Sequence, residues 1–478
     1  MLAWPGIATG VAAAVAMWVA WYFLHRPGLD TPLIVTGTAV GLTLVAMTAL
    51  LTRVAANAPA TGAIGGATAG LIGLMLLGSH IAKPQGADGA FNTQAPVIVL
   101  AFVASTTVLG LLGGLASNAL GRREAREPDR DLWLRRLALA AAASYVPLIA
   151  VGGLVTSTGS GMSVPDWPGT YGSNMFLYPF ALMEDPRIFY EHTHRLLGTL
   201  AGLSTVILLV GAFAMRASTT VRALAVALLA GVIVQGLLGG FRVAKDIPAF
   251  GFLHGVLGQG LLVIATITAA FVGRAFASSP AAAKTARPVF VLAAVSLACL
   301  AIQLSFGSLY RHLGSSHALY SHIGFSVIVT GAIAHVAIFS TKFKPNALGE
   351  DGSGADSSRA DNGGDTEAGV RLRRLAPAIF AVLAIQFTLG FAAWGFGSGY
   401  TERPTADQLA AAGDINYLGS IIATVHQANG AALAALTGLA LAWAVRAGAI
   451  ARRPAAAGSE NPPAAAVPQH EPNAIAGA

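Results

Sequence analysis

The sequence predicts an all-α polytopic membrane protein with about twelve transmembrane helices. Hydrophobic residues make up 55% of the 478 residues and charged residues 11%, a balance that no water-soluble domain of this length could bury in a single core. The apolar runs are continuous rather than alternating, which favours helices over barrel strands. Lipid must therefore be the solvent for much of the chain, and each span must pair its own backbone polar groups.

Hydropathy windows of about 19 residues define the predicted spans in order. The first lacks a basic leading segment and a small-residue cleavage site, so it is interpreted as a retained helix rather than a signal peptide. The spans lie near residues 5–24, 32–52, 61–80, 97–120, 137–156, 194–215, 222–241, 254–273, 288–308, 322–341, 375–395 and 421–445.

The loops between these spans differ in charge. Of the 29 Lys and Arg residues, 21 lie in the loops on the side of both termini and 8 in the opposite loops. The positive-inside rule therefore predicts cytoplasmic termini in the cell inner membrane, with lipid as the immediate partner. The net charge of +7 does not indicate nucleic acid, because the basic residues gather in particular loops. The single cysteine, Cys299, excludes an internal disulfide and a cysteine-based metal site.

The loops also suggest how the chain is divided. Two segments without hydrophobic periodicity, one acidic and rich in Gly and Ser and one rich in Ala and Pro, are predicted to be disordered. The divisions are an N-terminal four-helix block of unassigned role at 1–120, a basic cytoplasmic linker at 121–136, a first four-helix half at 137–273, a cytoplasmic loop at 274–287, a second half at 288–446 with a disordered loop at 347–370, and a disordered tail at 447–478.

A pattern repeats along the eight-helix block. Three spans carry a glutamine four residues before a glycine near their outer ends, and a fourth ends comparably with Gly152-Gly153. An outer loop follows each, and then a span that begins with a histidine. The Gln and Gly pairs are Gln235 and Gly239, Gln303 and Gly307, and Gln386 and Gly390; the histidines are His194, His254, His322 and His426.

Four histidines at equivalent places indicate ligand sites. A single one would more often be an interfacial histidine hydrogen-bonded to a neighbour. Imidazole suits haem iron, and two histidines on separate helices can clamp one porphyrin from both faces. Pairing by halves matches His194 with His254 and His322 with His426, which predicts two sites.

Charged groups surround the first histidine. Glu191, His194 and Arg195 are spaced i, i+3 and i+4 and share one helix face, whereas His192 points elsewhere. Arg195 could neutralise a carboxylate of the ligand or stabilise Glu191, and Glu191 could accept a proton. The alternative is a salt bridge at a helix end, which contributes little.

Other features carry weaker signals. The outer segment 152–168 is rich in turn formers and could cover a pocket. His312 falls in a later outer loop, and His25 and His80 have no partners along the sequence.

Taken together, these motifs resemble a known family. A Gly-Gly turn runs into Thr158-Gly-Ser-Gly-Met-Ser163, followed by Pro165-Asp-Trp-Pro168 and by Glu191-x-x-His194-Arg195. This order resembles the haem A synthase family (COX15/CtaA) over about residues 137–446.

The resemblance implies an eight-helix enzyme that oxidises the C8 methyl of haem O to the formyl group of haem A. It implies that His194 and His254 flank the substrate haem with Arg195 beside them, and that Glu191 is catalytic. His322 and His426 would ligate a haem b cofactor. The implied partners are a farnesyltransferase that supplies haem O and an electron acceptor of unknown identity; a homo-oligomer is left open.

Two departures from the family are evident. Val155-Thr156-Ser157-Thr158 stands where the family commonly has Thr-Arg-Leu-Thr, so a basic contact is missing, and residues 1–120 have no counterpart. Two other functions remain open. A non-catalytic di-haem electron carrier would keep the four histidines but would not need Glu191. A transporter would need helices broken at the midplane.

Overall fold

The computed structural model describes residues 3–82, 94–121, 129–273, 280–343, 367–396 and 415–449. Within these ranges twelve helices are long and apolar enough to cross a membrane, so the predicted all-α polytopic fold is confirmed. They are α1 Trp4–Leu24, α2 Leu33–Leu51, α3 Ala58–Ile81, α4 Ala95–Ala119, α5 Asp129–Ser157, α6 Pro186–Ala214, α7 Thr219–Ala244, α8 Pro248–Phe271, α9 Pro280–Leu313, α10 Ser316–Ser340, α11 Glu367–Phe396 and α13 Tyr417–Arg446, with short 3-10 turns at Thr52–Val54, Met175–Leu177 and Phe180–Leu182.

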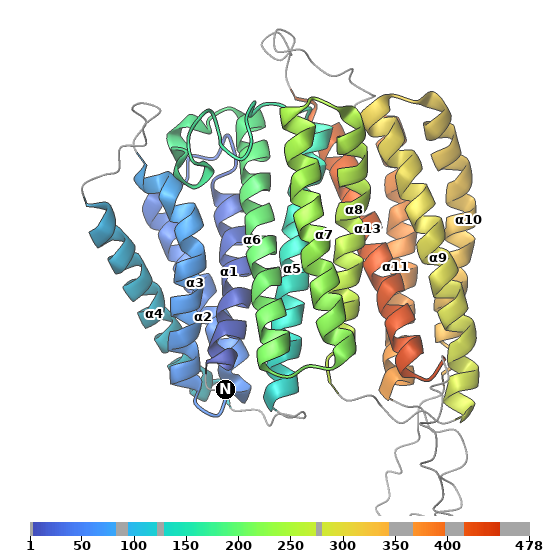
Figure 1. The fold of residues 1–478 in the computed structure, drawn as a ribbon, viewed down its shortest axis with the longest axis horizontal. Coiled ribbons are helices and arrows are strands. Elements are labelled where there is room, and N and C mark those ends of the chain that lie inside the picture. The colour runs from blue at the N-terminus through green and yellow to red at the C-terminus, as the bar shows by residue number, and fades with distance from the viewer. Residues whose placement is uncertain are drawn as a thin grey trace, which may run out of the picture.

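The helices stand upright in more than one layer (Figure 1). Along the longest axis of the molecule, α1 to α4 lie at one end, α5 to α8 in the middle and α9 to α13 at the other end. Helix α5 contacts α1, α6, α8 and α13, so it joins the N-terminal helices to the rest of the bundle. The N-terminus and the end of α13 lie on the same side, at the bottom of Figure 1.

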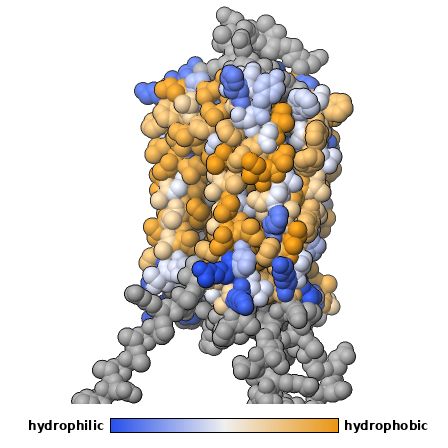
Figure 2. Space-filling model, turned by 90° about the vertical axis from the view of Figure 1, so that its right-hand side faces the viewer, coloured by the Kyte–Doolittle hydropathy of each residue, from blue (hydrophilic) through white to orange (hydrophobic). Residues whose placement is uncertain are grey.

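On the face that Figure 2 shows, an apolar belt lies between two more polar rims. Small residues let neighbouring helices approach closely where lipid gives no hydrophobic drive for association. The α3–α4 pair is one example, because a methyl group added at Gly66 would lie 2.1 Å from the Thr106 carbonyl oxygen. The protein is therefore a multi-pass membrane protein.

Several helices begin earlier than hydropathy predicts. Helix α6 starts at Pro186, with Asp185 accepting a hydrogen bond from the Arg187 amide as its N-cap. The polar first turns of such helices lower the hydropathy of a window that includes them. The four histidines consequently lie six to nine residues inside their helices, about 9–14 Å along the axis, and the prediction that they begin the spans is wrong.

Three other sequence interpretations change. Gly152 and Gly153 lie inside α5 and form no turn, because glycine in a membrane helix serves close packing. The second half of the expected linker, from Asp129, belongs to α5. His312 lies in α9 rather than in a loop. Residues 122–128, 274–279, 347–366 and 450–478, where the rest of the linker, loops and tail were predicted, lie outside the described residues.

Candidate functional site

The structure brings His194 on α6 and His254 on α8 face to face. Their ring centroids are 6.1 Å apart and the ring planes make an angle of 75°. Each ring lies against a glycine of a neighbouring helix. A methyl group at Gly152 would lie 2.9 Å from His194 Cε1, and one at Gly239 would lie 2.9 Å from His254 Cε1. These glycines leave the space that the imidazoles occupy.

The second half of the bundle repeats this geometry. His322 on α10 and His426 on α13 have ring centroids 6.2 Å apart, again at 75°. Methyl groups at Gly307 and Gly390 would lie 3.0 Å and 3.4 Å from the Cε1 atoms of His322 and His426. The histidines therefore pair as the repeat predicts, and the structure gives the repeated glycine a reason.

The repeated glutamines hold the histidine-bearing helices. The Gln235 side-chain amide donates to the His254 carbonyl at 2.8 Å, and His254 Nδ1 lies 3.0 Å from the Gln235 carbonyl oxygen. Gln303 and His322 make the same two contacts at 2.8 and 2.9 Å. Because a carbonyl only accepts, Nδ1 carries the proton in both rings, and Nε2 keeps the lone pair that a metal needs.

The amide clamp varies in the other two hairpins. Gln386 lies 3.3 Å from His426 Nδ1 through its amide nitrogen, and Asn429 donates to its oxygen at 2.8 Å. Leu148 occupies the corresponding position on α5, four residues before Gly152, so the histidine beside that glycine has no glutamine partner there.

The spacing of both pairs fits one iron between two imidazoles. Metal–imidazole nitrogen bonds are about 2 Å long, so two of them in line place the ring centroids about 6.3 Å apart once half of each ring is added. The observed 6.1 and 6.2 Å agree with this value without any helix movement. No group of three or more His, Cys, Asp or Glu side chains comes together among the described residues.

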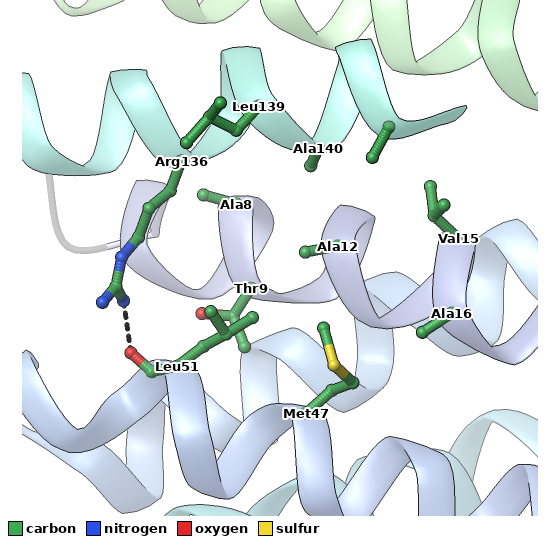
Figure 3. A pocket seen from close by; sticks show the side chains of 11 residues that line it. Ala8, Thr9, Ala12, Val15, Ala16, Met47, Leu51, Arg136, Leu139 and Ala140 are labelled. Atoms are coloured by element: carbon green, nitrogen blue, oxygen red, sulfur yellow. Dashed lines mark hydrogen bonds between the residues drawn. The ribbon is translucent and has the colours of Figure 1, made fainter. Parts of the chain in front are cut away.

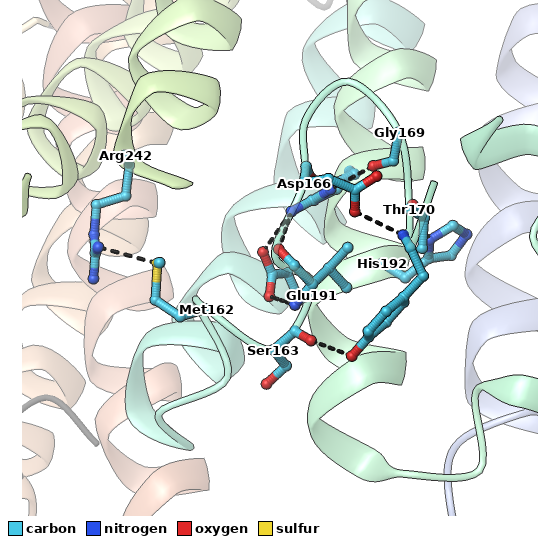
Figure 4. A network of polar contacts seen from close by, with 11 residues as sticks. Met162, Ser163, Asp166, Gly169, Thr170, Glu191, His192 and Arg242 are labelled. Carbon is cyan, nitrogen blue, oxygen red and sulfur yellow. Dashed lines mark hydrogen bonds and ion pairs between the residues drawn. The ribbon is translucent and has the colours of Figure 1, made fainter. Parts of the chain in front are cut away.

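Glu191, which lies one helix turn before His194 on α6, forms a buried polar network with the outer loop (Figure 4). One carboxylate oxygen accepts from the Val164 amide at 2.7 Å, and the other accepts from Arg195 at 2.8 Å. Glu191 is only 3% exposed. A buried carboxylate needs such partners, so the outer loop that carries Val164 and the α6 ion pair depend on each other.

Arg195 holds that outer loop. Besides Glu191, it donates to the carbonyl oxygens of Asp166 at 2.7 Å, Gly169 at 2.9 Å and Val164 at 3.0 Å. Both terminal nitrogens thus have two acceptors each, which leaves only the Nε–H for a ligand. Of the two roles considered for Arg195, stabilisation of Glu191 is the one that the contacts display.

Further contacts, which the sequence did not reveal, fold the loop back on itself. The Asp166 carboxylate accepts from the amides of Tyr171 at 2.6 Å and Gly172 at 2.9 Å, and the Tyr171 hydroxyl donates to the Ser163 carbonyl. Trp167 packs on Gly240 of α7, where an added methyl would lie 2.4 Å from the indole. The loop therefore covers the outer ends of α6 and α7, as a lid would.

His192 faces this loop rather than the histidine pair. Its Nδ1 lies 3.2 Å from the Thr170 hydroxyl, and its ring lies 5.3 Å from that of Tyr178. Burial raises the pKa of the Tyr178 phenol to about 12, so the Tyr178 side chain stays neutral at physiological pH. The prediction that His192 points away from the helix face of His194 agrees with these contacts.

The N-terminal helices also contact this loop. His25 and His80, which belong to no motif in the sequence, have ring centroids 5.3 Å apart. The Trp21 indole N–H donates to His80 Nε2 at 3.1 Å. Phe180 of the loop stacks on His80 at 5.0 Å. Because the contact joins segments that are distant in sequence, no local motif reveals it.

Another group lies near His254. A methyl group at Gly251 would lie 2.9 Å from both Arg242 Nε and His312 Nδ1, so two helices bring basic side chains to the outer end of α8. Arg242 also contacts Met162 of the loop at 3.2 Å (Figure 4).

Comparison with known proteins adds one match. The model of the COX15-CtaA family, described as cytochrome oxidase assembly protein, matches residues 135–323. The matched segment is less than half of the chain; it contains three of the four paired histidines and stops before His426. No curated protein and no solved structure matches the chain. Residues 135–323 of this twelve-helix membrane protein are therefore similar to the COX15-CtaA family of cytochrome oxidase assembly proteins.

Proposed function

We propose that the protein is a haem A synthase-like oxidoreductase that converts the C8 methyl of haem O to a formyl group for cytochrome oxidase. The observation that carries this proposal is the pair of matching histidine sites, at 6.1 and 6.2 Å, together with the buried Glu191 one helix turn before His194. Leu319 and Ala423 stand at the corresponding positions before the two histidines of the second pair. The match of residues 135–323 to the model of a cytochrome oxidase assembly family supports the same reaction. Two sites are needed if one holds a substrate haem and the other a cofactor haem.

The first half is the proposed substrate site. His194 and His254 would hold the iron of haem O, and the glycines beside them would fix the ring positions. The 163–171 loop would exclude water from the outer end of this site. His322 and His426 would hold haem b in the second half. A haem with two histidine ligands supplies one-electron transfer, which the oxidation of a methyl group requires.

Glu191 is the proposed proton acceptor. With water as the oxygen donor, oxidation of a methyl to a formyl group would release four protons and four electrons (R–CH3 + H2O → R–CHO + 4 H+ + 4 e−). The electrons would pass to the external electron acceptor, and a carboxylate next to the substrate would take up protons. The Val164 amide and Arg195 hold both of its oxygens, which fixes its position. Arg195 acts on the reaction through Glu191 and the loop, and any contact with a substrate carboxylate would use its remaining Nε–H.

The proposed location is the cell inner membrane with both termini in the cytoplasm. The charge difference between the two sets of loops supports this orientation, and the histidine pairs would then lie nearer the outer surface.

Pigment analysis after co-expression with a haem O source tests the reaction. The wild type should yield haem oxidised at the C8 methyl, identified by mass spectrometry of the extract. Glu191→Gln keeps an oxygen that can accept from Val164 but cannot take a proton at that position, so it should retain bound haem and lose product.

The matched control is Glu367→Gln, because Glu367 also pairs with an arginine four residues later but is exposed. This control should form product as the wild type does. A di-haem electron carrier would instead bind haem B in all three proteins and yield no oxidised haem O, which would overturn the proposal.

A further inference from the structure

We propose that an anionic phospholipid binds in a groove between α1, α2 and α5, with its phosphate at Arg136 and one acyl chain along the groove (Figure 3). The groove has a volume of about 310 Å³. It is lined almost entirely by apolar atoms, from Ala8, Thr9, Ala12, Val15, Ala16, Met47, Leu51, Arg136, Leu139, Ala140 and Ala143.

The shape of the groove fits a single acyl chain. Six of its eleven lining residues are Ala or Thr, and these small side chains leave the space between the helices open. Along α1 it runs from Ala8 to Ala16, a rise of about 12 Å at 1.5 Å per residue. One leaflet of a bilayer has a hydrocarbon depth of about 15 Å, half of the full core. The groove therefore extends over most of one leaflet, and it does not cross the membrane.

Charge selects the kind of lipid. Arg136 lies at one end of the groove in Figure 3, beside Leu51 and Ala8. Its guanidinium donates to the Leu51 carbonyl and stacks on Trp133 at 4.7 Å. A guanidinium has five N–H donors, so this anchoring fixes the position of the charge and leaves donors for a phosphate. No acidic residue lines the groove.

The position of the arginine along the membrane normal agrees with a headgroup. Arg136 lies two turns inside α5, on the side where α2 ends and α1 begins. That side carries the larger share of the basic residues. Basic pockets between transmembrane helices on such a side are typical sites for anionic headgroups. Membranes offer these lipids at high local concentration, so no special delivery is needed.

The groove also suggests what the lipid does. Its walls come from α2, which belongs to the N-terminal helices, and from α5, which belongs to the matched family region. A bound acyl chain would fill the gap between these helices. The lipid would thus join the N-terminal helices to the rest of the bundle on the side opposite the His25–His80 contact.

Native mass spectrometry of the purified full-length protein tests this proposal. The probes are phosphatidylglycerol and phosphatidylcholine with identical acyl chains, added to delipidated protein. One basic residue near the surface favours an anionic lipid about fivefold, so wild-type protein should show at least that preference. Arg136→Gln should abolish it.

Two further variants separate headgroup from chain. Arg135→Gln is the matched control, because the neighbouring Arg135 donates to the Val272 carbonyl at 2.8 Å and does not line the groove; this variant should keep the preference. Ala143→Phe, at an exposed groove position, should reduce binding of both lipids. The proposal is overturned if wild type binds both lipids equally, if Arg135→Gln and Arg136→Gln behave alike, or if Ala143→Phe binds as wild type does.

Discussion

Replacing Gly239 by alanine should disrupt the first histidine pair. The added methyl would lie 2.9 Å from His254 Cε1, whereas ordinary contacts begin at 3.4 Å, so the imidazole must retreat by about 0.5 Å. Metal–ligand distances tolerate only about 0.2 Å, and loss of the groups that orient a ligand typically weakens metal binding about 10- to 100-fold. Haem affinity of the first pair should therefore fall at least tenfold.

Haem titration of depleted protein, followed by the Soret band, measures this affinity. Gly236→Ala is the matched control, since it lies on the same helix and an added methyl meets no atom within 4 Å. A methyl group at Gly390 would lie 3.4 Å from His426 Cε1, which is an ordinary contact distance. Gly390→Ala should therefore leave the second pair unaffected. Equal haem affinity for Gly239→Ala and Gly236→Ala would refute the idea that glycine sets the ring position.

Two further predictions concern stability. Arg195→Met should lower the free energy of unfolding by about 3–5 kcal/mol, because it leaves the buried Glu191 carboxylate without its charged partner; the two side chains are 10% and 4% exposed. Arg371→Met breaks an exposed ion pair, in which Arg371 and Glu367 are 35% and 45% exposed. It should lower the free energy of unfolding by less than about 1 kcal/mol. Denaturant unfolding of both variants decides this, and similar losses would contradict it. Burial lowers the pKa of His25 below its ordinary 6.5, so below that pH the unfolded chain binds more protons and stability falls as pH falls. Melting temperatures between pH 7.5 and 5.5 should show this decline in wild type and a shallower one in His25→Gln; identical slopes would rule out a contribution from His25.

The sequence predicts the transmembrane helices and the histidine pairing well, and both for physical reasons. A membrane forces every span into a helix of a narrow length range, so continuous apolar runs are enough to find it. The hairpin repeat fixes which histidines share a depth, and Gln303 and Gly307 are part of the repeat because they clamp and seat His322.

Contacts between distant segments could not be predicted in this way. The Arg195 hydrogen bonds to the Asp166 and Gly169 carbonyls depend on how an irregular loop folds, and backbone acceptors leave no mark on the sequence. The meeting of His25 with His80 depends on the packing of α1 against α3. A glycine in the sequence can indicate either a turn or close helix packing. The sequence pattern indicates a turn at Gly152, but this glycine lies inside α5 and makes room for the His194 ring.

The most direct test of two separate haem sites is the pigment content of single-half variants after co-expression with a haem O source. His254→Ala should lose the haem O-derived pigment and keep haem b, because only the first pair is broken. His322→Ala should lose haem b and accumulate unoxidised haem O. Loss of both pigments from each variant, or of neither, would contradict the assignment of one haem to each pair.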